Sequence, residues 1–358
     1  MQIVIFGLSV SSSWGNGHAA LWRGLIRALH ADGHYVTFFE RDVSYYAQHR
    51  DLFELPGGGR LVLYPEWDEE QARQEADKAD VALLTSYCPD AQAATAVILE
   101  SRARLRCVYD LDTPVTLARI GAGEQVDYVG PRGYGDFDLV LSYTGGSSLD
   151  ELVERLGARR VVPLYGSADP DVHRPGERQP RYDALLSYLG TFAADRQSTL
   201  ERLFVVPART RADSRFVLAG ALYPADFPWT DNVFFVRHLP ASEHAAFYAS
   251  SRFTLNVTRA AMVATGWCPS GRLFEAAACG APIVSDVWEG LDCFFDPGDE
   301  IIIARTTDDV LAALDMTEVR RTAIGRRARA RMLAQHTAAR RARQMIAAFE
   351  GATEREMV

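Results

Sequence analysis

The chain alternates between short apolar runs and helical patterns, and this alternation restricts the fold more than any other feature. A first block of apolar runs covers residues 3–8, 35–39, 60–64, 80–85, 105–110, 138–143 and 160–164. A second block covers residues 184–190, 214–220, 232–236, 252–257, 282–286 and 300–304. Continuous apolar strands separated by helices are typical of parallel sheets covered on both faces. The sequence therefore predicts an α/β protein with two doubly wound, Rossmann-like domains.

The two blocks are separated by GSADPDVHRPGERQPRYD, a segment rich in proline, glycine and charge. Such composition is typical of a linker. We predict an N-terminal domain over 1–165, a linker over 166–183, a C-terminal domain over 184–325 and a final helix over 326–358. Ligands of doubly wound sheets bind outside the carboxyl ends of the strands. A cleft between two such domains is therefore the expected place for the chemistry.

Composition excludes several classes of protein. The net charge of −9 argues against non-specific binding to nucleic acid. The five cysteines include no CxxC pair, so we expect neither a disulfide framework nor a cysteine-ligated zinc site. The first apolar run is short and lacks a preceding basic stretch, unlike a signal peptide. No apolar stretch approaches the roughly 20 residues that span a bilayer. These features predict a cytoplasmic protein.

The C-terminal segment 317–350 is strongly basic, with nine arginines and two glutamates. Its small apolar side chains recur at helical spacing, at Ala330, Ala334, Ala338, Ala342, Met345 and Phe349. A basic amphipathic helix can lie on an anionic membrane, which leaves peripheral membrane contact open. A stripe that is mostly alanine offers little to insert into lipid. We therefore favour docking of this helix on the acidic first domain.

The loop SSSWGNGHAA follows the first predicted strand and precedes a helix. It lacks the third glycine of a dinucleotide fingerprint, so a dinucleotide is not the expected ligand. One interpretation is a capped helix start, with Ser13 or Asn16 accepting from free backbone N–H groups. The other is an open loop for a polar ligand, in which Gly15 and Gly17 allow the bend and His18 lies at the exit.

A second motif, CPSGRLFEAAACG, carries more specific chemistry. Ser270 and Gly271 would leave free amides at a helix N-terminus, where a phosphate is favoured. Arg272 adds charge and bidentate donors. Glu275 lies one turn into the helix, where it can accept hydrogen bonds from vicinal hydroxyls, and Gly280 is placed to end the helix. A diphosphate next to a ribose would satisfy both side chains; a capped helix with surface charges is the alternative.

These motifs carry a resemblance to a known family. PSGRLFEAAACGAPIVSDVWEGLDCFFDPGDEI resembles the C-terminal half of the CgeB-like, spore-maturation-protein glycosyltransferases, relatives of the glycogen-synthase-type retaining enzymes. SSSWGNGHA, VYDLDTP, SYTGG, LYGSADPDVHRP, YLGTFAADR and LNVTR resemble further segments of that family. The resemblance implies the GT-B fold, with two facing Rossmann-like domains and a C-terminal helix that crosses back to the first. It also implies a hexosyltransferase that uses a nucleotide sugar such as a UDP-sugar and no cofactor, with an unidentified acceptor.

The resemblance also implies where the donor binds. Glu275 matches the glutamate that holds the donor ribose. The residues expected beside the diphosphate are Gly190, Thr191, Arg196, Ser270, Gly271 and Arg272. His238 and Leu239 follow the third strand of the second domain, where related enzymes contact the base. Asn256, Thr258 and Arg259 follow the fourth strand, and Arg259 is either a phosphate ligand or a rim salt bridge.

One position departs from the family pattern. The retaining relatives carry a second glutamate eight positions before the ribose ligand, and Trp267 stands there in this chain. The donor sugar must therefore be held differently, and the stereochemical outcome does not transfer. A nucleotide-sugar epimerase or hydrolase and a non-catalytic nucleotide-sugar-binding protein remain alternatives, because fold does not fix function.

We expect no metal site in catalysis. Asp110-Leu111-Asp112 has the spacing of a D-x-D metal motif but falls in the acceptor half, so Arg196 and Arg272 are expected to replace a cation. Asp112 and His18 are the two candidates for the base that removes the acceptor proton. The loop Ser13, Trp14, Gly15, Asn16 and Gly17 is expected on the acceptor side; Trp14 either stacks on a sugar ring or packs between the domains.

Overall fold

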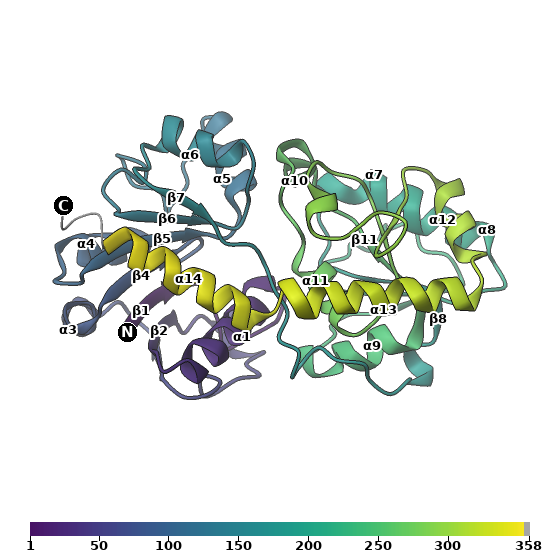
Figure 1. Ribbon diagram of the computed structural model, residues 1–358, viewed down its shortest axis with the longest axis horizontal. Coiled ribbons are helices and arrows are strands. Elements are labelled where there is room, and N and C mark those ends of the chain that lie inside the picture. Colours follow the sequence, from purple (N-terminus) through teal and green to yellow (C-terminus); the bar gives the residue numbers. More distant parts are fainter. Residues whose placement is uncertain (354–358) are drawn as a thin grey trace. The chain divides into compact units, whose positions relative to one another are not determined.

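The computed structural model describes residues 1–353, and its strands form two separate parallel sheets (Figure 1). Contacts divide the chain into two units. Unit 1 comprises Met1–Tyr165 and the C-terminal segment from Ala338 onward, and unit 2 comprises Gly166–Thr337. The prediction of two doubly wound α/β sheets is confirmed. No helix within residues 1–353 combines the length and the apolar character needed to cross a bilayer.

The sheet of unit 1 has the strand order β3-β2-β1-β4-β5-β6-β7, and all neighbours are parallel. Ile3 of the central strand pairs with Val36 on one side and Val81 on the other. Central strands of such a sheet are buried on both faces, which explains their unbroken apolar runs. The strands are β1 (Gln2–Gly7), β2 (Tyr35–Arg41), β3 (Arg60–Tyr64), β4 (Val81–Thr85), β5 (Leu105–Asp110), β6 (Leu139–Ser142) and β7 (Val161–Pro163).

Helices cover both faces of this sheet. They are α1 (Gly17–Ala31), α2 (Ser44–Ala47), α3 (Glu69–Lys78), α4 (Ala91–Glu100), α5 (Thr113–Gly121), α6 (Ser148–Leu156) and α14 (Ala338–Thr353). Alternate residues of β1 enter two different cores: Ile3 and Ile5 pack with α1 and α14, whereas Val4 and Phe6 pack with α3 and α4. This alternation is the side-chain period of a strand with helices on both faces.

The C-terminal helices correct one prediction. The expected stripe does not run through a single helix, because α13 (Glu318–Gln335) ends at His336 and α14 begins at Ala338. Ala330 and Ala334 are exposed. The buried face of α13 is formed by Ile324, Gly325, Ala328 and Met332. The stripe is buried from Ala338 onward, where Ala342, Met345 and Phe349 of α14 pack in the core of unit 1.

The sheet of unit 2 repeats the same arrangement, with the order β10-β9-β8-β11-β12-β13. Its strands are β8 (Ala184–Leu189), β9 (Phe216–Ala219), β10 (Val233–Val236), β11 (Ser251–Asn256), β12 (Ile283–Ser285) and β13 (Ile302–Ile303). Its α-helices are α7 (Gln197–Leu200), α8 (Val206–Thr210), α9 (His244–Ser250), α10 (Ala260–Thr265), α11 (Gly271–Ala278), α12 (Thr307–Leu314) and α13, and a π-helical turn, η3 (Glu201–Val205), joins α7 to α8. Four 3₁₀ turns, η1 (Pro180–Tyr182), η2 (Ala194–Arg196), η4 (Ala241–Glu243) and η5 (Leu291–Cys293), complete the described elements of unit 2.

The strand order places a topological switch in each sheet. The first strand of each unit has the second strand on one side and the fourth on the other. The direction in which successive strands are added to the sheet therefore reverses between β1 and β4 and between β8 and β11, although all these strands are parallel. Connections leave in opposite directions at such a point and open a crevice at the carboxyl ends of the two strands. The loops after β1, β4, β5, β8 and β11 are therefore where functional side chains should collect.

Candidate functional site

The start of α11 is tied to the switch point of unit 2 by Arg272. Its Nη1 donates to Oδ1 of Asn256 at 2.8 Å, at the end of β11. Its Nε donates to the carbonyl of Leu189, at the end of β8. The guanidinium also lies over the ring of Tyr188, 5.0 Å from its centroid. The helix N-terminus, with Ser270 as its N-cap residue, is thereby fixed beside both strand ends.

The loop after β8 closes against the same arginine. A Cβ at Gly190 would lie 2.7 Å from Nη2 of Arg272 and 2.7 Å from the hydroxyl of Tyr188, so a larger residue there would displace these side chains. Arg196 donates to the carbonyl of Thr191, and its guanidinium carbon lies 5.9 Å from the Tyr188 ring centroid. The structure therefore brings the residues expected beside a diphosphate into one group. Two arginines and a helix N-terminus make this group attractive to an anion.

Glu275 lies in the next turn of α11 and is surrounded by basic groups. His244, the first residue of α9, places Nδ1 3.4 Å from Oε2 of Glu275. His173 places Nε2 3.9 Å from Oε1 of the same carboxylate. Burial alone raises the pKa of Glu275, but His173, His244 and Arg272 outweigh it and lower the pKa to about 2. The carboxylate is therefore ionised at neutral pH and able to accept hydrogen bonds.

The two histidines are candidate site residues that sequence reasoning missed. His173 comes from the segment predicted as a linker, and residues 166–183 pack within unit 2. Its ring is buried, with 4% of the residue exposed, and Nε2 lies 3.3 Å from Nδ1 of His244. Burial lowers the pKa of His173. The histidines lie 102 and 31 positions before Glu275 in sequence, so no local pattern joins them.

The loop after β11 is held by an acidic side chain that the sequence analysis did not single out. Asp286 accepts from the backbone N–H of Thr258 at 2.8 Å and from its hydroxyl at 2.9 Å. Arg259 pairs with Asp195, with 3.1 Å between Nε and Oδ2, so in this structure it forms a salt bridge. Arg259 was expected to be either a phosphate ligand or part of a salt bridge, and the structure contains the salt bridge.

His238 and Leu239 do not belong to the group around Arg272. They follow β10, the edge strand of the sheet, which is separated from β8 by β9. Leu239 is buried and His238 is partly exposed. Their contact with a base stays a prediction.

The opening loop of unit 1 is folded around a buried carboxylate. Glu40, at the end of β2, accepts from the hydroxyls of Ser9 and Ser11 at 2.9 and 2.5 Å. It also accepts from the amides of Val10 and Ser11 at 2.8 and 2.9 Å. The groups that a loop of this kind would offer to an anion are thus already occupied. Glu40 thus accepts the hydrogen bonds that the loop would otherwise offer to an anion.

The rest of the loop is also engaged within unit 1. Asn16 is the N-cap of α1 and accepts from the His18 amide at 3.1 Å, as the capping interpretation expected. The Ser13 hydroxyl donates to Asp51 at 2.6 Å. Trp14 stacks on His49 with ring centroids 3.9 Å apart. Gly15 has a φ of 59°, a left-handed conformation that favours glycine, and Gly17 begins α1.

The two candidate bases form a pair. Nε2 of His18 lies 3.6 Å from Oδ2 of Asp112, and each side chain is about one-fifth exposed, at 19% and 18%. Tyr87, with an unusual φ of 64°, donates from its hydroxyl to Asp112. Burial, together with this neighbouring charge, raises the pKa of Tyr87. A partly exposed carboxylate–histidine pair at the carboxyl ends of β1, β4 and β5 can accept a proton from a bound hydroxyl.

The two aspartates of the D-x-D spacing do not share a surface. Asp110 is fully buried, whereas Asp112 reaches His18. The Asp110 carboxylate accepts from the Asp112 amide at 3.1 Å, from Thr116 Oγ1 at 3.1 Å and from the Tyr134 hydroxyl at 3.2 Å. Burial raises the pKa of Asp110 to about 6. This arrangement suits a structural carboxyl group better than a metal ligand.

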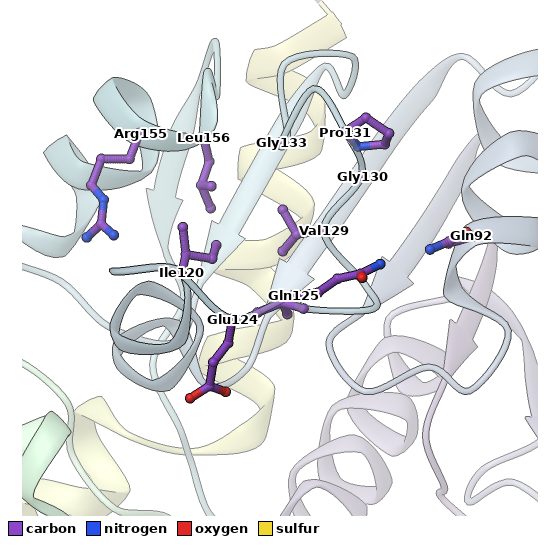
Figure 2. A pocket seen from close by; sticks show the side chains of 11 residues that line it. Gln92, Ile120, Glu124, Gln125, Val129, Gly130, Pro131, Gly133, Arg155 and Leu156 are labelled. Carbon is purple, nitrogen blue, oxygen red and sulfur yellow. The ribbon is translucent and has the colours of Figure 1, made fainter. Parts of the chain in front are cut away.

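A cavity of about 410 Å³ in unit 1 lies apart from these groups (Figure 2). Its wall is formed by the end of α5, the loop that follows it and the end of α6, and includes Ile120, Glu124, Val129, Arg155 and Leu156. None of the predicted site residues lines this cavity. It therefore carries no part of the proposed chemistry.

Comparisons with known proteins agree with the fold. Residues 196–347 match the family described as glycosyl transferase-like, a range that includes Arg272 and Glu275. This part of the chain is therefore similar to glycosyltransferases. A comparison with curated proteins gave no match.

Solved structures share the whole architecture. Sucrose-phosphate synthase from Thermosynechococcus elongatus is 14% identical, with a TM-score of 0.70 over 98% of this chain and 99% of that one. Anabaena Alr3699/HepE, solved with UDP and glucose, is 12% identical, with a TM-score of 0.69 over 98% and 100%. A glycosyltransferase from Rickettsia africae is 9% identical, with a TM-score of 0.63 over 98% of each chain. At these identities the likeness shows a shared fold, that of GT-B glycosyltransferases.

Proposed function

We propose that the protein transfers a sugar from a nucleoside-diphosphate sugar to an acceptor hydroxyl without a metal ion, and that it is a CgeB-like glycosyltransferase. The observation that carries the proposal is the group at the start of α11. There Arg272 and Glu275 lie beside the ends of β8 and β11, within the segment that matches the glycosyl transferase-like family. A cation and an ionised carboxylate one turn apart suit a diphosphate joined to a ribose.

The diphosphate would bind at the anion-attracting end of unit 2. The amides at the start of α11 and the guanidinium groups of Arg272 and Arg196 provide donors and positive charge. During transfer the bond between the sugar and the diphosphate breaks, and negative charge develops on the departing phosphate oxygen. Fixed positive groups that stabilise this charge lower the barrier. They would replace the divalent cation that many transferases use.

The ribose would be held by Glu275. Its carboxylate is fixed by the contact with His244, so little side-chain freedom is lost when the ribose binds. Each carboxylate oxygen has lone pairs for more than one donor, so the ribose hydroxyls can add to the histidine contacts. Leu239 and His238 stay the candidates for the base.

Unit 1 would bind the acceptor and remove its proton. The acceptor oxygen attacks the anomeric carbon, and its proton passes to the pair formed by Asp112 and His18. Because the two side chains are 3.6 Å apart, either can accept the proton while the other stabilises the result. The loop from Ser13 to Gly17 leads directly into His18 and is the proposed acceptor-side segment. No disulfide joins the five cysteines, all of which lie within the described residues, and this suits the cytoplasm, where we place the enzyme.

The first test is donor binding. A thermal-shift series of the full chain with UDP, GDP and ADP should show stabilisation by one of them, because a ligand at 100 times its Kd stabilises by about 2.7 kcal/mol. UDP is the first candidate, since the Anabaena structure similar to this fold was solved with UDP and glucose. Glu275→Ala should then weaken the affinity by about 1.5–3 kcal/mol, with exposed Glu318→Ala as the matched control. Unchanged calorimetric affinity in a folded Glu275→Ala protein would overturn the ribose role.

The second test separates the classes of activity. The nucleotide sugar that binds is incubated with the protein alone and then with an acceptor panel. Transfer to an acceptor supports the proposal. Epimerised sugar or rapid hydrolysis without an acceptor would instead identify an epimerase or a hydrolase, and binding without turnover across the panel would identify a binding protein.

A further inference from the structure

Three metal-ligating side chains meet inside unit 2, and they come from three separate elements. His173 lies in the segment between β7 and β8, His244 begins α9, and Glu275 lies in the middle of α11. Within residues 1–353 they form a group whose ligand atoms all lie within 4.8 Å of one another. The group is at most slightly accessible, with side-chain exposures of 5%, 12% and 13%.

The spacing of the ligand atoms matches a tetrahedral ion. A zinc ion bound by nitrogen and oxygen ligands at about 2.0–2.1 Å holds those ligands about 3.3–3.4 Å apart. Here the separations are 3.3 Å between His173 Nε2 and His244 Nδ1, 3.4 Å from His244 Nδ1 to Glu275 Oε2, and 3.9 Å from His173 Nε2 to Glu275 Oε1. The two histidines face different oxygens of the carboxylate, so a rotation of that group, or ligation through both oxygens, would complete the geometry.

The chemistry of the group fits the same class of ion. Two imidazoles and one carboxylate are a common donor set for zinc, with a fourth position left for water or another ligand. One buried polar atom beside the group has no hydrogen-bond partner among the described residues, namely the hydroxyl of Tyr248. Tyr248 follows His244 by one turn of α9, on the same side of that helix. Buried polar atoms without partners are rare and indicate a missing ligand or water.

We propose that His173, His244 and Glu275 bind a divalent transition-metal ion of the zinc class. A second consequence rests on the proposed function: the ion uses the carboxylate assigned to the donor ribose. Ion and donor should therefore compete, so the metal acts as an inhibitor rather than as a catalyst. This role agrees with arginines at the diphosphate, since the ion would lie at the ribose end.

Metal binding is tested without any donor. The full chain, free of affinity tags and stripped with a chelator, is titrated with zinc chloride by calorimetry and with cobalt chloride by visible absorption. We expect one ion per chain and the absorption of tetrahedral cobalt. His173→Ala and His244→Ala should each lower zinc affinity by roughly 100-fold or more, since loss even of a supporting residue costs 10- to 100-fold. His34→Ala, a histidine in unit 1, should leave it unchanged.

Several outcomes would overturn the site. These are no zinc binding, binding that survives both histidine substitutions, or equal loss in His34→Ala. Because both histidine variants keep Glu275, and their melting curves report folding, a failure to fold cannot imitate a loss of ligands. None of these outcomes bears on donor binding, so the proposed function is judged separately.

Competition is tested with UDP, or with whichever nucleoside diphosphate binds. Zinc should weaken its affinity for the wild-type protein at least tenfold. Diphosphates also chelate zinc in solution, and His173→Ala controls for this because it removes the site but keeps the chelation. A zinc effect of equal size in that variant would overturn the competition, while zinc binding itself would stand.

Discussion

Two carboxyl groups near the carboxyl edges of the sheets, Asp110 in unit 1 and Glu275 in unit 2, have pKa values that are shifted in opposite directions. Asp110 in unit 1 is surrounded by hydroxyls and an amide, and burial raises its pKa to about 6. Glu275 in unit 2 is also buried, but two histidines and Arg272 lower its pKa to about 2. Both sheets have the same strand order, so the fold does not cause the difference. The neighbouring charges do.

The difference bears on the tasks that the proposed function gives to the two units. Unit 2 gathers positive groups and holds a negative charge among them, which suits a ligand with an anionic and a hydroxylic part. Unit 1 pairs Asp112 with His18. The proposal places donor binding and proton removal on different sheets, and each assignment can be tested independently.

The largest effect is expected at the pair in unit 1. Asp112→Asn and His18→Ala should each lower turnover by about 100- to 10,000-fold, because a positioned general base is lost. Donor affinity should stay nearly constant, since the proposed donor contacts belong to unit 2. Steady-state rates and donor Kd values for both variants check this.

The pair also predicts non-additivity. Because the side chains are 3.6 Å apart, the double variant should be little worse than the more damaging single one. Asp127→Asn, an exposed aspartate of the same unit, is the control and should keep full turnover. Normal turnover in both single variants would remove the acceptor-side assignment and leave the loop as a helix cap.

The next effect concerns the stability of unit 1 at different pH values. The pKa of Asp110 is raised from 3.8 to about 6, so between these values the folded state holds a proton that the unfolded state has released. Stability therefore falls as pH rises through this window. This difference in the pKa of Asp110 corresponds to about 3 kcal/mol in the free energy of unfolding. Asp110→Asn should remove this loss.

Denaturant unfolding at pH 4, 5, 6 and 7.5 provides the measurement. The stability of Asp110→Asn relative to wild type should increase by up to about 3 kcal/mol between pH 4 and pH 7.5. Effects of the substitution that do not depend on pH cancel when the values at pH 4 and pH 7.5 are subtracted. A difference that does not change with pH would mean that Asp110 titrates normally and that the contrast with Glu275 is smaller than described.

A third effect is expected in unit 2. Arg272→Ala should weaken nucleoside-diphosphate binding by about 1.5–3 kcal/mol, because it removes hydrogen bonds made by a charged donor. Arg272→Lys should recover only part of the loss, since lysine lacks the planar fork that reaches both Asn256 and Leu189. Arg327→Ala, an exposed arginine of α13, is the control. Equal affinity in all three variants would exclude the diphosphate from this end of the sheet.

The smallest effect is expected on removal of metal. A chelator should leave turnover unchanged, or raise it where zinc copurifies, because the proposed catalytic groups need no cation. Activity before and after treatment with EDTA gives the answer. Full loss on chelation, restored by magnesium or manganese, would assign Asp110 and Asp112 to a metal and reverse the roles of the two units.

The sequence predicted the layers of the fold because their signal is local. Thirteen short apolar runs between helical patterns could satisfy their backbone groups only in buried parallel sheets, and the two sheets have thirteen strands. The start of α11 was predictable for the same reason: the cap, Arg272, Glu275 and the terminating Gly280 lie within eleven positions. The prediction of one helical stripe through Ala330 and Ala334 was wrong, because residue spacing alone does not reveal that the helix is interrupted at His336.

What the sequence determined by itself was therefore the secondary structure, the fold class and the chemistry of single motifs. Tertiary structure alone decided which side chains meet. Glu40 fills the opening loop, His18 reaches Asp112 across 94 positions, and His173 and His244 converge on Glu275. These groups are brought together by the order of strands in a sheet, which local spacing does not encode. Their charges depend on burial and on neighbours, so the opposite titration of Asp110 and Glu275 exists only in the folded chain.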